Sequence, residues 1–253
     1  MKGSQERRAA IITGAAGGLG AAVAELLAES GHNLILVDNR ASDLEEFAAT
    51  LPKNGSRFLS LAVDLADTTA CENVITETVA QFGRVDILVN AAAILNRRDL
   101  EDVTPEYFDE IFHVNTRALL FLSRAAIPEM AKYNWGRIVN CTSIGVYQGG
   151  NTMTSIVYEG TKGAVAVFTK MFANYGADKG VLVNTVCPGG MKSRLNTEAF
   201  TNPAILQMTL DHIPLKRLCE PIEVARMVAW LVGDENTYAT GATFDIIGGR
   251  VMN

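Results

Sequence analysis

The stretch AAIITGAAGGLG, residues 9–20, joins a short apolar run to a glycine-rich turn, and an Ala-rich amphipathic segment begins at Ala21. This order is typical of a dinucleotide-binding turn, because glycines let the backbone approach a pyrophosphate and the helix N-terminus offers free N–H groups to the anion. An acidic residue, Asp38, ends the next apolar run about 20 residues further on, where its carboxylate can bind both hydroxyls of a ribose. The alternative is a glycine-rich turn that only packs a strand on a helix.

Further apolar runs follow along the chain and alternate with longer segments whose apolar residues recur every three or four positions. The runs are 33–38, 57–64, 85–90, 136–142 and 181–187, and the amphipathic segments are 21–30, 70–82, 107–133 and 158–178. Runs that are apolar throughout indicate strands buried on both faces, and the three-to-four spacing indicates helices. Their alternation predicts an α/β fold, a doubly wound parallel sheet (Rossmann fold) in three layers, with residues 1–253 forming a single domain.

Glycines and prolines mark the ends of these elements. We expect six glycines to adopt the left-handed conformation that closes a helix: Gly31, Gly55, Gly83, Gly136, Gly180 and Gly233. The segment 191–214 is polar and is broken by Pro203 and Pro214, which predicts a surface insertion that covers a site.

The composition excludes several classes of protein. Of the 253 residues, 48% are hydrophobic and 20% are charged, the opposite of a disordered chain. The net charge of −6, without a basic run longer than a pair of residues, argues against nucleic acid and anionic membranes as partners. Residues 9–28 carry only one charge, Glu25, but their glycines argue against a membrane span, and no cleavage pattern indicates a signal peptide.

The cysteines and histidines show no metal-ligand spacing. The four cysteines, Cys71, Cys141, Cys187 and Cys219, lie far apart in the sequence, without the close pairing of a zinc site or redox motif. We therefore predict no metal cofactor and a reducing, cytoplasmic location.

The motifs resemble those of the short-chain dehydrogenase/reductase family, in its single-domain form of roughly 250 residues. The resemblance runs from Ala9 almost to the C-terminus. Its motifs are Thr13-Gly14-x-x-x-Gly18-x-Gly20, Asp64, Asn90-Ala91-Ala92-Ala93, Asn115, Ser143, Tyr158-x-x-x-Lys162 and Pro188-Gly189. The spacing of Gly14, Gly17 and Gly20 also fits the longer, epimerase-like branch, but the chain is too short for the C-terminal substrate domain of that branch.

The candidate catalytic residues are Ser143, Tyr158, Lys162 and Asn115. Tyr158 and Lys162 are four residues apart, so on one helix they share a face, where an ammonium favours a phenolate. Lowering the pKa of a tyrosine by roughly three units requires about 4 kcal/mol, of which one cation supplies a part. The resemblance implies that Lys162 also holds the nicotinamide ribose, that Asn115 anchors a proton-relaying water chain, and that Ser143 hydrogen-bonds the substrate oxygen.

The resemblance also implies a set of cofactor-binding residues. They are Gly14, Gly18, Leu19, Gly20, Asp38, Asp64, Leu65, Asn90, Ala91, Ala92, Tyr158, Lys162, Pro188, Gly189, Met191 and Ser193. We predict NAD rather than NADP, because the carboxylate of Asp38 repels a 2′-phosphate and residues 15–17 provide no cation. The nearby Arg40 keeps NADP as the second choice.

Two departures from the family pattern stand out. Ala93 replaces the usual glycine after the fourth strand, which predicts a slight loss of cofactor affinity. Ser143 and Tyr158 are fifteen residues apart instead of the commonest thirteen, so the loop between them carries an apparent two-residue insertion. Thr142 is the fallback for the serine role.

The resemblance places a mixture of apolar and amide side chains around the substrate. The predicted substrate residues are Ile94, Asn96, Ser143, Tyr147, Gln148, Asn151, Tyr158 and Gly190, with Leu95, Ile144, Met191 and residues 196–208 nearby. The mixture favours a modestly polar or cyclic alcohol. Arg97 and Arg98 could meet an acidic substrate, but a solvated pair is favoured because adjacent residues rarely point the same way.

These observations predict reversible hydride transfer between NAD and a secondary alcohol/ketone pair. The alternatives are an NADP-dependent 3-oxoacyl reductase, a sugar or polyol dehydrogenase and, more distantly, a non-catalytic nucleotide-sensing protein. The expected partners are a small-molecule substrate and further copies of the chain. Family members usually form homotetramers through the helices that carry Asn115 and Tyr158 and through the region of residues 242–247.

Overall fold

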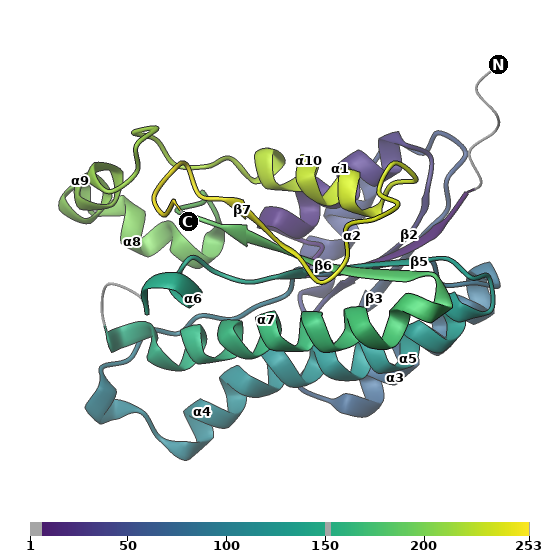
Figure 1. The fold of residues 1–253 in the computed structure, drawn as a ribbon, viewed down its shortest axis with the longest axis horizontal. Helices are drawn as coiled ribbons and strands as arrows, with labels where there is room; N and C mark the ends of the chain where they lie inside the picture. Colours follow the sequence, from purple (N-terminus) through teal and green to yellow (C-terminus); the bar gives the residue numbers. More distant parts are fainter. Residues whose placement is uncertain (1–6, 150–152, 253) are drawn as a thin grey trace.

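A computed structural model describes residues 7–149 and 153–252, in which seven strands form one parallel sheet (Figure 1). The strands are β1 (Ala9–Thr13), β2 (Asn33–Asp38), β3 (Phe58–Ala62), β4 (Ile87–Asn90), β5 (Gly136–Cys141), β6 (Val181–Pro188) and β7 (Thr243–Ile246). Their order is β3-β2-β1-β4-β5-β6-β7, and every neighbouring pair is parallel. The predicted doubly wound parallel sheet is confirmed.

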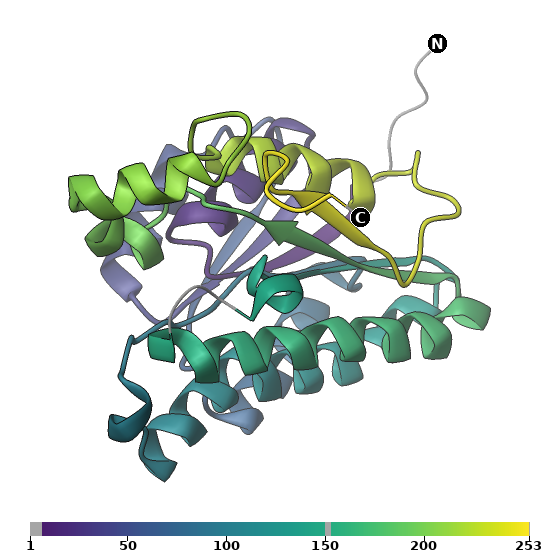
Figure 2. The same ribbon diagram turned by 60° about the vertical axis from the view of Figure 1, so that its left-hand side comes forward.

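Helices cover both faces of the sheet, which makes three layers (Figures 1 and 2). One face carries α1 (Gly18–Glu29), α2 (Ala41–Thr50) and α10 (Pro221–Val232), and the other carries α3 (Thr68–Phe82), α5 (Ala118–Ala131) and α7 (Ile156–Gly176). The remaining elements are α4 (Pro105–Phe112), the π-helical turn η2 (His113–Arg117), α6 (Gly145–Gln148), α8 (Thr197–Thr201), α9 (Pro203–Asp211), and the 3₁₀ turns η1 (Leu100–Asp102), η3 (Met153–Ser155), η4 (Ala177–Lys179) and η5 (Arg194–Asn196).

The central strands are apolar throughout because successive side chains point to opposite faces of the sheet and both faces are covered by helices. In β1, Ile12 packs into the core beneath α1 and α10, with Leu27 and Val228. Its neighbour Ile11 packs into the other core, with Leu122 of α5. A strand that is buried on both sides shows no polar alternation, and this is the pattern that the sequence displays.

Most predicted elements lie where expected, with differences at the ends and in the middle of one helix. β1 and β2 have the predicted bounds, whereas β3 and β4 are shorter and β6 reaches Pro188. The helix predicted over 107–133 is helical without a break from Pro105 to Ala131, but the π-helical turn η2 interrupts it between α4 and α5. β7 lies within the expected C-terminal strand region of residues 242–247, whereas no bounds were predicted for α2 and α10.

Four of the six predicted left-handed glycines are confirmed, namely Gly31, Gly55, Gly83 and Gly180. The prediction is wrong for Gly136 and Gly233. Gly136 opens β5 at a point where a Cβ would come within 2.6 Å of the sulfur of Met130, and the left-handed residue in this connection is Asn134, with φ 48°. Gly233 is extended, with φ −79° and ψ 169°. The glycine at position 136 is therefore explained by close packing against Met130 and not by a left-handed backbone conformation.

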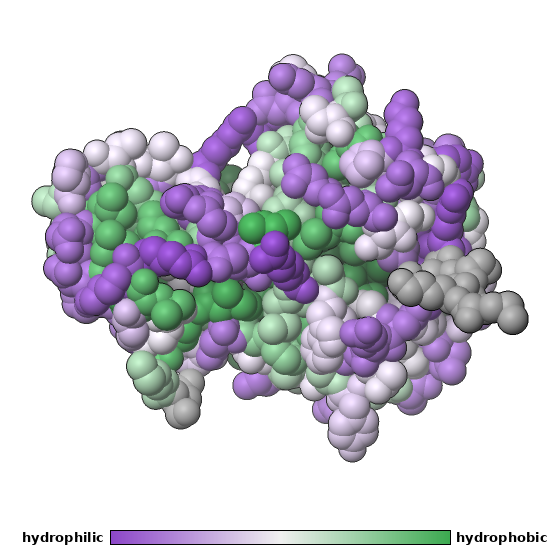
Figure 3. All heavy atoms as spheres, turned by 90° about the horizontal axis from the view of Figure 1, so that it is seen from above, coloured by the Kyte–Doolittle hydropathy of each residue, from purple (hydrophilic) through white to green (hydrophobic). Residues whose placement is uncertain are grey.

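The segment 191–214 folds into two short helices, α8 and α9, that form a lobe beside the sheet (Figures 1 and 3). Arg194 forms an ion pair with Asp43 of α2 at 2.7 Å, and Lys192 pairs with Glu220 at the start of α10. The lobe is less polar than expected, because Ile205 and Met208 of α9 are exposed. Apolar side chains are visible on this lobe in Figure 3.

Two features are absent from the described residues. None of the helices there is both long and apolar enough to cross a bilayer. Nor does that part of the chain bring together three or more His, Cys, Asp or Glu side chains in an arrangement that could hold a metal ion.

Candidate active site

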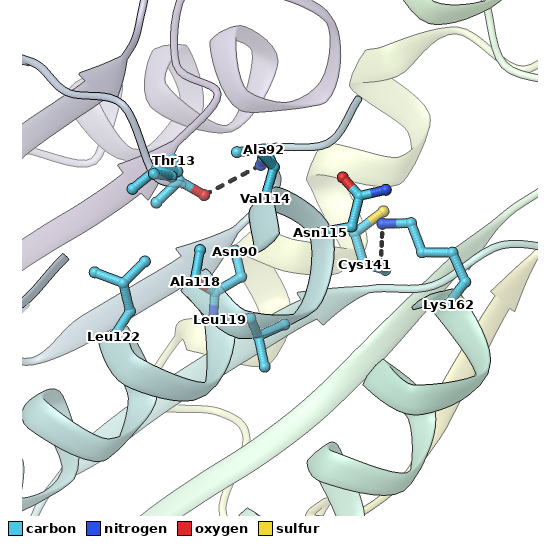
Figure 4. A pocket seen from close by; sticks show the side chains of 11 residues that line it. Thr13, Asn90, Ala92, Val114, Asn115, Ala118, Leu119, Leu122, Cys141 and Lys162 are labelled. Carbon is cyan, nitrogen blue, oxygen red and sulfur yellow. Dashed lines mark hydrogen bonds between the residues drawn. The ribbon is translucent and has the colours of Figure 1, made fainter. Parts of the chain in front are cut away.

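The predicted site residues lie at the carboxyl ends of the strands, around the point where the chain order of the sheet reverses. β1 stands between β2 and β4, so the connections from β1 and β4 leave in opposite directions and open a crevice there. The hydroxyl of Thr13 accepts hydrogen bonds from the N–H groups of Ala91 and Ala92, each at 3.1 Å. These bonds join the end of β1 to the segment after β4 (Figure 4).

Three glycines of the predicted pyrophosphate turn, Gly14, Gly18 and Gly20, are required by backbone conformation or by close packing. Gly14 and Gly18 have φ of 67° and 52°, a conformation that side chains disfavour. A Cβ on Gly14 would also stand 2.9 Å from the Cα of Ala92, and a Cβ on Gly20 would overlap the carbonyl of Gly14. The turn therefore holds three backbone segments in close contact.

The N-terminus of α1 is suited to an anion. Among the described residues, no side chain caps it, and its first turn contains no acidic residue. Its first N–H groups therefore lack intrahelical partners and carry the positive end of the helix dipole. The unpaired N–H groups and the absence of side chains at the glycines of the turn fit a dinucleotide pyrophosphate.

Asp38 is buried at the end of β2 and faces this turn. Its carboxylate accepts hydrogen bonds from the N–H of Ala16 and the N–H of Arg40, both at 3.1 Å. The guanidinium of Arg40 also pairs with Asp38 at 3.1 Å and with Asp43 at 2.7 Å. Arg40 is therefore held between two carboxylates beside the turn.

The other predicted adenosine residues are less directly arranged. Asp64 is exposed and accepts a hydrogen bond from the N–H of Ala66 at 2.9 Å, while Leu65 is buried. The amide of Asn90 donates to Asn140 at 2.8 Å, and its buried oxygen has no partner among the described residues. Leu65 and Asn90 line a small pocket (Figure 4), with Thr13, Ala92, Val114, Asn115, Ala118, Leu119, Leu122, Cys141 and Lys162.

Ala93 needs no glycine conformation. Among the described non-glycine residues, positive φ angles occur at Asn54, Asn134 and Lys216, and Ala93 is not one of them. The alanine is therefore accommodated without backbone strain, and its effect on cofactor affinity stays a prediction.

Asn115 lies in the π-helical turn η2, and π-helical turns are frequent at functional sites. Its buried side chain both accepts from the N–H of Ile94, at 2.8 Å, and donates to the carbonyl of the same residue, at 2.9 Å. It also donates to the hydroxyl of Thr161 on α7, at 3.3 Å. Asn115 thus fastens the segment after β4 to the helix that carries Tyr158.

Tyr158 and Lys162 share one face of α7, as their spacing predicts. The ammonium of Lys162 lies 5.4 Å from the centre of the Tyr158 ring and donates to the carbonyl of Cys141 at 2.8 Å. Burial raises the pKa of Tyr158 well above its ordinary value, and Arg97 opposes that rise. Burial also lowers the pKa of Lys162. Burial is thus a larger influence on the pKa of Tyr158 in the protein alone than the charge of Arg97, and the role of Lys162 toward the phenolate stays a prediction.

Ser143 follows β5 and points into the loop that the sequence shows to be longer than usual. Its hydroxyl oxygen accepts a hydrogen bond from the N–H of Gly145 at 3.2 Å. The fallback residue Thr142 is buried, and its hydroxyl donates to the carbonyl of Val186 in the sheet. The described part of the longer loop folds into α6 and η3.

The predicted substrate residues lie on several elements. The phenol of Tyr147 donates to Asp245 of β7 at 3.0 Å, Gln148 is exposed, and the carbonyl of Asn96 accepts from the hydroxyl of Tyr107. A Cβ on Gly190 would lie 3.2 Å from the side chain of Leu218, so the glycine leaves space for that leucine. Ile94 is held by Asn115, as described above, and Asn151 lies outside the described residues.

The two adjacent arginines point to different surroundings. The guanidinium of Arg98 lies over the ring of Tyr107, 4.8 Å from its centre. The charge of Arg97 instead lowers the pKa values of Tyr158 and Glu159, which places it toward the catalytic side chains. Both side chains are exposed, in agreement with the predicted solvated pair.

The residues predicted to meet the nicotinamide follow β6. The N–H of Gly189 donates to the carbonyl of Ile246 at 3.0 Å, so this turn is joined to β7. The backbone of Met191 forms an isolated β-bridge with the backbone of Cys219. The Cβ of Ser193 lies 3.6 Å from the position that a Cβ on Gly18 would occupy. The structure thus brings Ser193 beside the pyrophosphate turn, although the two are far apart in the sequence.

Sequence reasoning missed three side-chain contributions at this site. Thr13 was noted only as a motif residue, although its hydroxyl joins β1 to the segment after β4. Thr161 and Glu159, within the Tyr158-x-x-x-Lys162 motif, contact Asn115 and Gly145. The position of Thr161 and Glu159 between Tyr158 and Lys162 could have marked them as candidate site residues. Which residues they contact is decided by the packing of α7.

Comparison with known proteins identifies the family. A family model described as enoyl-(acyl carrier protein) reductase matches residues 14–250. The chain is 34% identical over 243 residues to the 2,5-dichloro-2,5-cyclohexadiene-1,4-diol dehydrogenase of Sphingobium indicum, covering 96% of this chain and 95% of the relative. The chain belongs to the short-chain dehydrogenase/reductase family.

Solved structures agree with this assignment. A 3-ketoacyl-(acyl-carrier-protein) reductase from Brucella melitensis complexed with NADH superposes with a TM-score of 0.88 at 29% identity, covering 98% of this chain and 100% of the other. A protein from Beutenbergia cavernae with bound NADP gives 0.87 at 29% identity, covering 96% of each chain. The protein is an oxidoreductase of the NAD(P)-dependent alcohol dehydrogenase and ketone reductase type.

The close packing at Gly14 leads to a test with a matched control. Replacing Gly14 by Ala should weaken NADH binding at least tenfold, because the new Cβ would displace the segment after β4. Gly31→Ala places a side chain at a similar φ of 83° with nothing within 4 Å.

Both substitutions should lower the free energy of unfolding by about 1–2 kcal/mol, but only Gly14→Ala should affect NADH affinity. Fluorescence titration with NADH and chemical denaturation measure the two quantities. Equal NADH affinity in both variants would contradict the proposed turn.

Proposed function

We propose that the protein catalyses reversible hydride transfer between NAD and a secondary alcohol/ketone pair, with Tyr158 as general acid/base. The observation that carries this proposal is that Tyr158 and Lys162 share one face of α7, with the Lys162 ammonium 5.4 Å from the centre of the Tyr158 ring. Lys162 lines the same pocket as Thr13, Asn90 and Asn115. The face of α7 that carries Lys162 therefore lies at the carboxyl ends of β1 and β4, where the cofactor is proposed to bind.

The residues that would hold the cofactor are those at the strand ends. The α1 N-terminus would bind the pyrophosphate, Asp38 the adenosine ribose, Lys162 the nicotinamide ribose, and Met191 with Ser193 the carboxamide. The domain would comprise residues 1–253, with the lobe of residues 191–214 covering the substrate. When bound, NAD accepts or returns the hydride.

The remaining steps belong to the side chains. In ketone reduction, the Tyr158 hydroxyl donates its proton to the substrate oxygen, while the Ser143 hydroxyl stabilises the developing negative charge by a hydrogen bond. In alcohol oxidation, the phenolate takes the proton back. Lys162 stabilises that phenolate, and Asn115 supports the path by which the proton exchanges with solvent. Because burial raises the pKa of Tyr158, the neutral acid form predominates before catalysis, which suits reduction.

The surroundings of Asp38 support NAD over NADP. If Asp38 binds the adenosine ribose as proposed, its carboxylate would repel the negative charge of a 2′-phosphate. The nearest cation, Arg40, is already paired with Asp38 and Asp43. A cation compensated by two carboxylates attracts a phosphate weakly.

For the substrate, we propose a modestly polar or cyclic secondary alcohol. The relative from Sphingobium indicum is named as a dehydrogenase of a cyclic diol, and the predicted pocket residues combine apolar and amide groups. A 3-oxoacyl reductase and a sugar or polyol dehydrogenase are the competing assignments. All four cysteines are free thiols, which supports a reducing compartment such as the cytoplasm as the working location.

The general acid/base is tested by Tyr158→Phe. This variant should lose turnover at least a hundredfold, because no other group can protonate the substrate oxygen, while NADH binding stays close to that of the wild type. Absorbance of NADH with a panel of secondary alcohols and ketones measures turnover, and fluorescence titration measures binding. Retained activity in the variant would refute the mechanism.

Cofactor preference is tested by Asp38→Ser. The wild type should have a higher kcat/KM with NADH than with NADPH, and the variant should reduce that preference at least tenfold, because Arg40 loses one carboxylate and can meet a 2′-phosphate. Asp43→Ser is the matched control, since it removes the other partner of Arg40 and leaves the ribose carboxylate in place. Similar efficiency of the wild type with both coenzymes would overturn the proposal.

We further propose a homotetramer assembled through the outer faces of α4 and α7. These helices expose several large apolar side chains, namely Phe108, Val167, Met171 and Tyr175. Gly160 and Gly163 of α7 have no side chain that would keep another helix at a distance. An apolar face of this kind is characteristic of a buried interface.

Light scattering should therefore give the mass of four chains of 27.2 kDa each. Met171→Glu should shift the mass to a smaller species, because the interface would bury an unpaired charge. Glu77→Lys, on exposed α3 surface, is the control and should leave the mass unchanged. A monomeric wild type would disprove the assembly.

A further inference from the structure

Glu159, the residue after the proposed acid/base, has a half-buried carboxyl group that the mechanism above does not use. One of its oxygens, Oε2, is buried and lacks a hydrogen-bond partner among the described residues. Burial of an ionised carboxylate without full hydrogen bonding is costly. Such a group beside a catalytic tyrosine calls for a functional explanation.

The carboxyl group occupies the space that a side chain at residue 145 would need. A Cβ on Gly145 would overlap the carboxyl of Glu159. Gly145 is buried and has no positive φ, so its backbone conformation does not require glycine. The glycine of α6 and the glutamate of α7 are therefore a matched pair, in which the missing side chain makes room for the carboxyl.

Gly145 also contacts Ser143, through its backbone N–H. The N–H of Gly145 donates to the Ser143 hydroxyl oxygen at 3.2 Å, so the residue that accommodates Glu159 also holds the serine. A hydrogen bond with the Ser143 side chain lowers the pKa of Glu159, but burial is the larger effect and leaves that pKa above its ordinary value of 4.5.

The charged and titratable groups around Glu159 come from few elements. Lys162 and Tyr158 lie on the same helix, and Arg97 reaches it from the segment after β4; the two cations lower its pKa. On α6, the phenol of Tyr147 is engaged with Asp245. On α4, the phenol of Tyr107 donates to the carbonyl of Asn96.

The protonation state of Glu159 decides what Ser143 can do. A serine hydroxyl has one hydrogen to donate and two lone pairs that accept. An ionised Glu159 accepts that hydrogen and withdraws it from the substrate. A protonated Glu159 instead donates its own hydrogen to the serine oxygen, whose second lone pair accepts from Gly145, and the serine hydrogen is then free for the substrate oxygen.

We propose that Glu159 is a positioning residue which, in its protonated form, donates a hydrogen bond to Ser143 and directs the serine hydroxyl to the substrate oxygen. This inference rests on the proposed function, because it assumes that Ser143 binds the substrate oxygen. It adds a residue that acts only through Ser143.

The pH profile of Glu159→Gln tests this role. For wild-type ketone reduction at saturating NADH, kcat should fall as pH rises through an ionisation above pH 4.5, separately from the alkaline loss that belongs to Tyr158. The glutamine cannot ionise, and its amide donates at every pH. The variant should therefore lack the first inflection and exceed the wild type above it. Glu159→Ala should also lack this inflection, and below it should be about tenfold slower than the wild type, the effect of one hydrogen bond.

A double-mutant cycle shows whether the effect passes through Ser143. In a Ser143→Ala background, Glu159→Gln should change neither kcat nor the pH profile further. Glu77→Gln, an exposed glutamate on α3, is the control for a general change of charge. An unchanged inflection in Glu159→Gln, or an equal effect of that substitution in the Ser143→Ala background, would overturn the proposal.

A spectroscopic readout separates this proposal from the proposed function. Infrared difference spectra across the same pH range should show a protonated carboxyl band that disappears in Glu159→Gln and shifts in frequency in Ser143→Ala. This measurement needs no turnover, so an enzyme inactive toward the whole panel would refute the proposed function and leave the Glu159 result readable. A band that is unaffected by Ser143→Ala would refute the positioning role.

Discussion

The structure depends on the close backbone contact between the turn after β1 and the segment after β4. At Gly14, a side-chain Cβ would stand 2.9 Å from the Cα of Ala92, and the Thr13 hydroxyl holds Ala91 and Ala92 from below. This contact sets the width of the crevice at the sheet reversal. The helix dipole of α1 and the pocket near Lys162 can serve one bound molecule because this contact places them side by side.

A second common feature of the site is the burial of its ionisable groups. Burial raises the pKa values of Tyr158 and Glu159 and lowers that of Lys162, so in each case it favours the neutral form. The residues that surround these groups, such as Asn115 and Gly145, act by holding the donors and acceptors in fixed directions.

Much of the fold and of the site could be predicted because their signals are local. β1 and β2 have the predicted bounds, since their apolar runs are short and end at a glycine turn and at an acidic residue. The π-helical turn η2 could not be predicted, because its apolar spacing matches that of a continuous helix. Gly136 was misassigned for a related reason: its role is to accommodate Met130, a contact between two elements that no local pattern reveals.

The sequence by itself determined the order of strands and helices, the pyrophosphate turn and the Tyr158-x-x-x-Lys162 face, because each depends on residues a few positions apart. Only the tertiary structure decided which way Arg97 and Arg98 point, that Ser193 lies beside Gly18, and that Glu159 fills the space at Gly145. These facts depend on the packing of α7 and the lobe of residues 191–214 against distant segments. Periodicity specifies which face of an element is buried, whereas the partner that buries it is set by the geometry of the whole sheet.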